Sequence, residues 1–123
     1  MIDHFGINVT DMEKARAFYD KVLGVLGYGR VMDFGTAVGY GTDSPDFWIS
    51  TFDGVGENRE VHLAFQAESA DAVRAFVAAA VELGAEVLHE PRLWPEYHAA
   101  YFGGFVRDTE VNNLEAVTHQ GEA

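Results

Sequence analysis

Three side chains far apart in the chain, His4, His62 and Glu115, are of the types that hold a divalent metal ion. Two imidazoles and one carboxylate form a ligand set that leaves coordination positions open for a substrate. Glu115 lies in the strand-like stretch VNNLEAV, residues 111–117, where burial of an unpaired carboxylate costs several kcal/mol. A metal would supply the missing partner, provided that the fold brings both histidines to Glu115.

An internal repeat relates the two histidines. The tripeptide Arg-Ala-Phe occurs at residues 16–18 and again at 74–76, an offset of 58 that also joins His4 to His62. The same offset superimposes two apolar stripes with the i, i+3, i+4, i+7 spacing of a helix face: Ala15, Phe18, Tyr19 and Val22 on Val73, Phe76, Val77 and Ala80. The sequence therefore predicts two copies of one structural unit.

Each copy begins with a strand and continues with a helix. Apolar residues alternate with polar or small ones over 5–9 and 61–65, which predicts half-buried strands. Helices are expected over about 11–26 and 69–83. Three shorter strands follow each helix, at 28–33, 36–40, 47–51, 86–89, 101–107 and 113–118, and a longer loop spans 90–100. The predicted fold class is α+β.

The helix boundaries have recognisable signals. Thr10 with Glu13 resembles a capping box, and Ser69 can cap the second helix. Gly27 and Gly84 are expected to end the two helices. A single domain over 1–123 should thus contain two βαβββ modules, about 1–56 and 57–120, that form a curved mixed sheet around a cleft.

Strand alternation predicts where the three candidate ligands point. Leu114 and Ala116 should face the helices, so Glu115 faces the other way, as do His4 and His62. If the modules enclose a cleft, the three side chains meet there. The alternatives are that the histidines are merely hydrogen-bonded, that Glu115 protects an exposed sheet edge, or that the three form a metal-free relic around water.

Composition excludes several kinds of partner. The chain has 8 basic and 20 acidic residues, a formal charge of −12, which argues against nucleic acid and membrane surfaces. Cysteine is absent, so disulfides and thiolate metal sites are not possible. The N-terminal segment lacks the pattern of a secretory signal, and a cytoplasmic location is the expectation.

On these residues the sequence resembles the vicinal oxygen chelate superfamily, which includes glyoxalases, bleomycin resistance proteins and extradiol dioxygenases. The similarity lies in IDHFGINVTDMEKARAFY at the start, VHLAF at the second unit and YFGGFVRDTEVNNLEAV at the end. The resemblance implies paired βαβββ modules around a metal that substrates chelate through adjacent oxygens. It implies His4, His62 and Glu115 as metal ligands, with Fe, Zn, Ni or Mn as the ion.

The chain departs from the family pattern at two places. The fourth ligand of glyoxalase I would fall in DFWIS, where alternation favours Trp48, a residue that cannot bind metal. Where the family often has Pro-Asp-Gly, this chain has Thr109-Glu110-Val111, and valine takes a positive φ poorly. The turn before the last strand is therefore expected to differ in geometry.

The long loop WPEYHAAYF carries the candidates for proton transfer. His98 and Tyr101 are the expected catalytic residues, and Trp48 and Tyr97 are expected to bind substrate. Phe52 and Trp94 are further aromatic candidates for the wall of an apolar cleft. The remaining histidines, His89 and His119, are expected in solvent.

Two functions remain open from the sequence. One is a metal-dependent lyase, isomerase or ring-cleaving dioxygenase acting on a small substrate with vicinal oxygens. The other is a binding protein of the bleomycin-resistance kind, which sequesters a small molecule without chemistry. In either case a homodimer is expected, because this fold leaves sheet edges unpaired.

Overall fold

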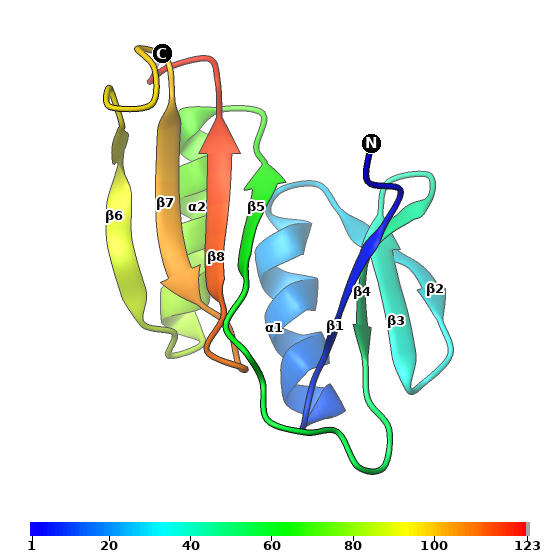
Figure 1. Cartoon of the computed structure of the whole chain (residues 1–123). Helices are drawn as coiled ribbons and strands as arrows, with labels where there is room; N and C mark the ends of the chain where they lie inside the picture. The colour runs from blue at the N-terminus through cyan, green and yellow to red at the C-terminus, as the bar shows by residue number, and fades with distance from the viewer. Residues whose placement is uncertain (123) are drawn as a thin grey trace.

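The computed structural model describes residues 1–122 and contains two βαβββ modules (Figure 1). The first module contains β1 (Phe5–Asn8), α1 (Met12–Gly24), β2 (Gly29–Asp33), β3 (Ala37–Gly41) and β4 (Pro45–Ser50). The second contains β5 (His62–Gln66), α2 (Ala70–Glu82), β6 (Val87–Leu93), β7 (Phe102–Arg107) and β8 (Asn113–Thr118). The predicted α+β class and the duplicated module are confirmed.

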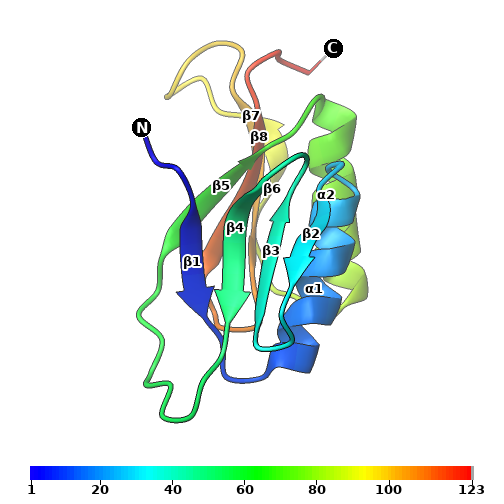
Figure 2. The same ribbon diagram turned by 90° about the vertical axis from the view of Figure 1, so that its right-hand side faces the viewer.

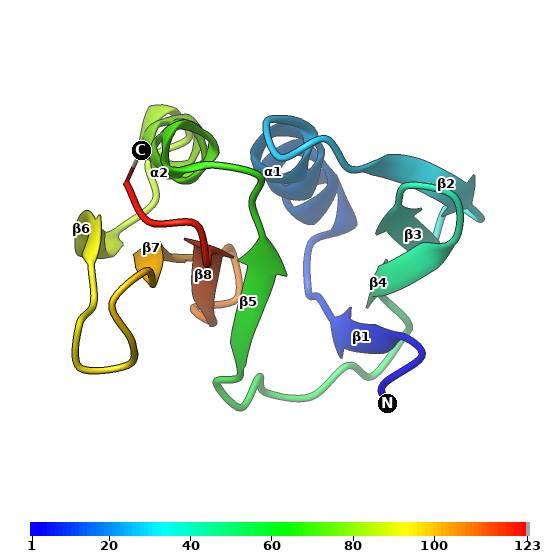
Figure 3. The same cartoon turned by 90° about the horizontal axis from the view of Figure 1, so that it is seen from above.

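Each module has its own four-stranded mixed sheet. The strand orders are β1-β4-β3-β2 and β5-β8-β7-β6, with the first two strands of each order parallel and the others antiparallel. No strand of the described residues pairs across the modules, so β1 and β5 are both edge strands. The sequence predicted one curved sheet around a cleft, whereas the structure has two separate sheets. The faces of the two sheets that are not covered by helices point outward in different directions (Figure 3).

The helices bury the apolar stripes that the repeat predicted. All eight stripe residues are buried, together with others on the same faces. The two helices pack side by side where the modules meet (Figure 3), and one hydrophobic cluster contains residues of both modules. Phe47 of β4 meets Phe65 of β5 edge to face, with ring centres 5.3 Å apart. The modules therefore share one core although their sheets are separate.

One predicted cap is corrected. Asp11, not Thr10, caps α1, and its side chain accepts a hydrogen bond from the Lys14 amide. Thr10 does not cap the helix because its amide and hydroxyl both donate to the carboxylate of Glu110 in the second module, at 3.2 and 3.0 Å. Ser69 caps α2 as predicted. Both helices are followed by a glycine with positive φ, as expected.

A buried polar cluster joins the modules beside Thr10 and Glu110. Asp108 is 7% exposed and accepts from the Tyr19 hydroxyl of α1. Asn112, which is fully buried, donates to Asp108 and accepts from the Val61 amide just before β5. Burial and the negative charge of Asp108 raise the pKa of Tyr19 well above its usual value, so this tyrosine remains a hydrogen-bond donor. The cluster fixes the chain before β5 and β8.

The turn that enters β8 contains Val111 in the left-handed region, with φ of +67°. The expectation that valine avoids this conformation is wrong, and the physical reason is the buried carboxylate beside it. Asp108 accepts from the amides of Glu110 and Asn112, both at 2.8 Å, which fixes the backbone on each side of Val111. The valine side chain is 59% exposed, so the turn is held by its neighbours and not by packing of Val111.

Neither helix within residues 1–122 has the length and apolar character needed to cross a bilayer.

Candidate functional site

His62 and Glu115 lie together on the free face of the second sheet, opposite α2. In the parallel β5–β8 ladder, Ala64 is opposite Glu115 and His62 is opposite Asn113, so both side chains emerge on the same face. The distance from His62 Nε2 to Glu115 Oε1 is 3.0 Å. Glu115 is buried at 2% exposure, whereas about half of the His62 side chain is exposed. The predicted pairing of this histidine with the strand carboxylate is thus present within one chain.

The contact of the other ring nitrogen, Nδ1, indicates which species must lie between His62 and Glu115. His62 Nδ1 lies 3.2 Å from the carbonyl oxygen of Asn113. A carbonyl only accepts, so Nδ1 carries a proton, and in neutral His62 the Nε2 lone pair then faces a carboxylate oxygen. Two acceptors at 3.0 Å repel unless a cation joins them. That cation is either a second proton on the imidazole or a metal ion.

Tyr101 holds the second oxygen of the carboxylate. Its hydroxyl donates to Glu115 Oε2, which leaves Oε1 directed at His62. Burial first, and then the hydrogen bond and charge of Glu115, raise the pKa of Tyr101. The tyrosine is therefore neutral at physiological pH and acts as a donor, not as a base. Gly103 on β7 makes room for this contact, because a Cβ there would lie 3.0 Å from Glu115 Oε2.

Aromatic rings line the site on one side. Phe105 is opposite Glu115 in the β7–β8 ladder, and its ring lies nearly parallel to that of His62, with centres 5.8 Å apart. His89 and Trp94 pack edge-on against Phe105, and Tyr97 lies over Trp94. Phe105 and His89 were not among the predicted site residues, although β7 pairs antiparallel with β8 and alternation places Phe105 on the face of Glu115.

His4 is not at this site within the chain. It lies just before the edge strand β1 of the other sheet, is exposed, and contacts Asp3 through Nδ1 at 2.6 Å. Across the described residues, no three histidine or acidic side chains come close enough to hold a metal ion. One chain therefore provides two of the three predicted ligands in one place.

The strand register identifies the counterpart of Glu115 in the first module. The repeat relates Gly6 to Ala64, and the strand partner of Gly6 is Trp48, just as the partner of Ala64 is Glu115. Trp48 thus occupies the position predicted for a fourth ligand. Its ring lies over Gly39, where a Cβ would come within 2.9 Å, and is parallel to Phe34 at 6.2 Å. The free face of the first sheet is therefore aromatic at this position.

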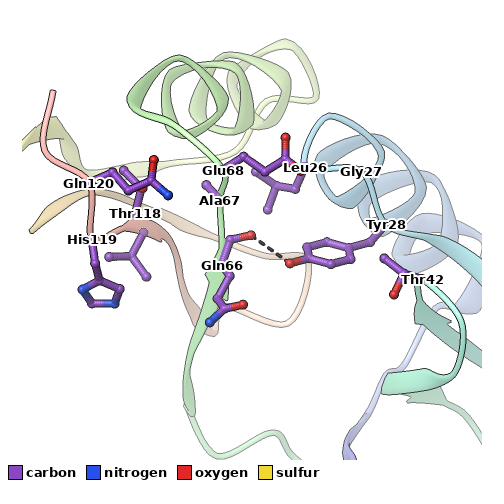
Figure 4. A pocket seen from close by; sticks show the side chains of 11 residues that line it. Leu26, Gly27, Tyr28, Thr42, Gln66, Ala67, Glu68, Thr118, His119 and Gln120 are labelled. Carbon is purple, nitrogen blue, oxygen red and sulfur yellow. Dashed lines mark hydrogen bonds between the residues drawn. The ribbon is translucent and has the colours of Figure 1, made fainter. Parts of the chain in front are cut away.

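His98 lies beside Tyr101 but both of its ring nitrogens are engaged. Nδ1 accepts from the Ala100 amide at 3.2 Å, and Nε2 lies 2.9 Å from Nδ1 of His119. His119 is exposed, as expected, and it lines a cavity of about 430 Å³ between the ends of α1, β5 and β8 (Figure 4). The hydroxyl of Tyr28 bonds the Gln66 carbonyl across this cavity. No pattern in the sequence pointed to the His98–His119 pair.

The donor set suits a first-row divalent metal. The 3.0 Å between His62 Nε2 and Glu115 Oε1 is a normal separation for adjacent ligands with bonds of about 2.1 Å. The Nδ1 hydrogen bond to a backbone carbonyl is the outer contact that metal-binding histidines usually make, and Tyr101 orients the carboxylate in the same way. The residues present therefore fit a metal ion, with further ligands required from elsewhere.

Comparison with known proteins agrees with this architecture. The sequence pattern of the Glyoxalase/Bleomycin resistance protein/Dioxygenase superfamily matches residues 1–116, and the chain belongs to this superfamily. None of the curated proteins compared with the chain matches it.

Among solved structures, a glyoxalase/bleomycin resistance protein from Albidiferax ferrireducens is 26% identical, with 94% of this chain and 96% of that chain covered and a TM-score of 0.83. A glyoxalase/bleomycin resistance protein/dioxygenase family enzyme from Burkholderia phytofirmans has 18% identity, coverage of 94% and 96%, and a TM-score of 0.73. A mutant of the fosfomycin resistance protein FosX from Listeria monocytogenes, complexed with Mn(II) and 1S,2S-dihydroxypropylphosphonic acid, has 19% identity, coverage of 97% and 88%, and a TM-score of 0.67. The last two similarities concern the fold alone.

Proposed function

We propose that this protein is a divalent-metal-dependent enzyme that acts on a small substrate with vicinal oxygens. The proposal is supported above all by His62 Nε2, which lies 3.0 Å from the buried carboxylate of Glu115 while Nδ1 is held by the Asn113 carbonyl. Superfamily membership supports it, as does the Mn(II) in the FosX structure. A bound ion would polarise a substrate carbonyl or stabilise an enediolate as a Lewis acid.

The side chains of the second sheet would have different roles around the ion. His62 and Glu115 hold it, and Tyr101 keeps the carboxylate oriented through Oε2. Phe105 and Trp94 exclude water from one side, which strengthens the electrostatic contacts of a bound substrate. Proton transfer by His98 requires that one of its nitrogens be released from its present partners.

We further propose that His4 reaches this site from a second copy of the chain. The first sheet exposes apolar side chains on its free face, with Met32 at 46% and Phe34 at 69% exposure beside Trp48. A twofold symmetric pair would cover this face with the free face of the partner's second sheet and would also protect the edge strands β1 and β5. Each dimer would then contain two equivalent sites.

Mixing variants tests the shared site. His4→Ala and Glu115→Ala homodimers are both expected to lose tight metal binding. A mixed dimer has one site with all three ligands intact and one site with neither His4 nor Glu115, so mixing should restore binding to one site per mixed dimer. Metal-binding stoichiometry after mixing measures this, with light scattering to confirm the dimer. Absence of restoration in mixed dimers, or a monomer at all concentrations, contradicts the shared site.

The second candidate function is a ligand-binding protein without chemistry. It is supported by Trp48 at the position equivalent to Glu115 and by the parallel rings of Trp48 and Phe34, which suit a planar ligand. Ligand-induced thermal stabilisation that persists in excess chelator favours this function. Loss of stabilisation with the chelator favours the enzyme.

A further inference from the structure

The pair formed by His98 and His119 is an in-line hydrogen bond between two imidazoles. His98 Nε2 and His119 Nδ1 are 2.9 Å apart, the ring planes differ by 22°, and the ring centres are 5.1 Å apart. The distance between the ring centres exceeds the distance between the two nitrogens by about twice the distance from a ring centre to one of its atoms. The two nitrogens therefore lie nearly on the line that joins the ring centres. The rings therefore meet edge to edge, as a hydrogen bond requires.

The backbone assigns the protons of this pair. The Ala100 amide can only donate, so His98 Nδ1 is unprotonated and the neutral ring carries its proton on Nε2. That proton is donated to His119 Nδ1, which must also be unprotonated. A proton added to His98 Nδ1 would oppose the Ala100 amide, and one added to His119 Nδ1 would oppose His98. The arrangement therefore requires two neutral histidines.

The pair attaches the loop that carries Tyr101 to the segment after β8. Both segments project from the same end of the second module (Figure 2), and the only other hydrogen bond that joins them within residues 1–122 runs from the Gly121 amide to the Ala100 carbonyl, at 2.8 Å. The Tyr101 amide donates to the His98 carbonyl, and the Tyr101 ring packs edge-on against both imidazoles.

We propose that His119, acting through His98, positions Tyr101 on Glu115, and that proton uptake by the histidine pair releases this position. The inference rests on the proposed function of the His62–Glu115 site and adds a means of regulating it. At neutral pH the loop is held and the carboxylate is oriented. Under acidic conditions one proton breaks either the imidazole contact, when it is on His119 Nδ1, or the Ala100 contact, when it is on His98 Nδ1. In either case Tyr101 loses part of its support.

Several other ionisable groups lie around the pair. Arg92 pairs with Glu96 in the loop, Arg74 pairs with Glu122 after β8, and Glu68 lines the cavity beside His119. Tyr97 contacts the ring of Tyr101, behind which lies Glu115. Carboxylates, arginines and tyrosines ordinarily titrate outside pH 5–8, whereas histidine titrates within it. His89 packs against Trp94, away from the pair, and supplies a matched control.

Amide hydrogen exchange on the metal-free protein tests the inference. Between pH 8 and pH 5, after correction for intrinsic exchange, protection of the Ala100 and Gly121 amides should fall by about fivefold, the loss of one hydrogen bond. His119→Asn keeps an acceptor oxygen near the place of Nδ1 but cannot be protonated. It should keep at pH 5 the Gly121 protection seen at pH 8, whereas the Ala100 amide still responds to His98. The Tyr101 ring resonances should move less with pH than in the wild type, because only His98 still titrates beside this ring.

The control His89→Asn should retain the pH dependence of the wild type. The inference is overturned if the wild type shows no loss of protection at pH 5, or if the Gly121 amide loses the same protection in His119→Asn as in the wild type. Because metal is absent from this experiment, failure of metal binding would leave the outcome unchanged. Separate metal titrations at pH 8 then decide the proposed function itself.

Discussion

Replacement of Val111 by glycine should stabilise the protein, although it removes an apolar side chain. Val111 has φ of +67°, where a β-branched residue is strained by about 1–2 kcal/mol. Glycine relieves this strain but adds about 0.5–1 kcal/mol of unfolded-chain entropy. The side chain is 59% exposed, so little buried surface is lost. The net gain should be about 0.5–1 kcal/mol.

Asparagine tolerates the same conformation without the full entropy cost of glycine, so Val111→Asn should gain about 1 kcal/mol, or about 3–5 °C in Tm. Chemical denaturation and thermal unfolding measure both variants. Val25 is a matched control because it is 41% exposed but has φ of −70°, and Val25→Gly should destabilise the protein. Equal losses of stability in Val111→Gly and Val25→Gly would show that Val111 is not strained in the folded chain.

Three other perturbations have defined outcomes. Gly103→Ala places a Cβ 3.0 Å from Glu115 Oε2, so it should weaken metal binding and cost about 1–3 kcal/mol of stability. Gly24→Ala is the control, because a Cβ there would have nothing within 4 Å, and it should leave metal binding unchanged. Competition titrations measure both. Burial and neighbouring carboxylates raise the pKa values of Tyr19, Tyr40 and Tyr101. The unfolding free energy should therefore be steady between about pH 8 and pH 10 and fall as the pH rises further, because only the unfolded chain then ionises. A flat profile in denaturant titrations from pH 8 to pH 11 would contradict this. A metal that binds the folded state alone should raise the unfolding free energy by about 2.7 kcal/mol at 100 times its Kd, and Glu115→Ala should abolish this increase in thermal scans.

The repeat made the module architecture predictable from the sequence. The helix stripes and the strand histidines recur at one offset, and each stripe is buried as expected. Alternation along β8 correctly placed Glu115 opposite the helices, beside His62. Local pattern and register were sufficient for these features because each depends on residues within one module.

Features that depend on contacts between distant segments were not predictable. Thr10 does not act as the predicted helix cap because its hydroxyl donates to Glu110, which lies 100 residues away in the sequence. The positive φ of Val111 depends on the buried carboxylate of Asp108. The separation of His4 from Glu115 follows from the packing of two sheets as independent units, and no periodicity within either module encodes that arrangement.

The most direct test of the metal site is the metal content of untagged protein beside that of Glu115→Ala, measured by elemental mass spectrometry. About one ion per wild-type chain is expected, with loss of the ion in the variant, because Glu115 is the buried anionic ligand facing His62. Iron would direct assays to catechols and oxygen, whereas zinc, nickel or manganese would direct them to isomerase and lyase substrates. Wild-type protein that contains no metal and takes up none of these ions when they are added would contradict a metal site at His62 and Glu115.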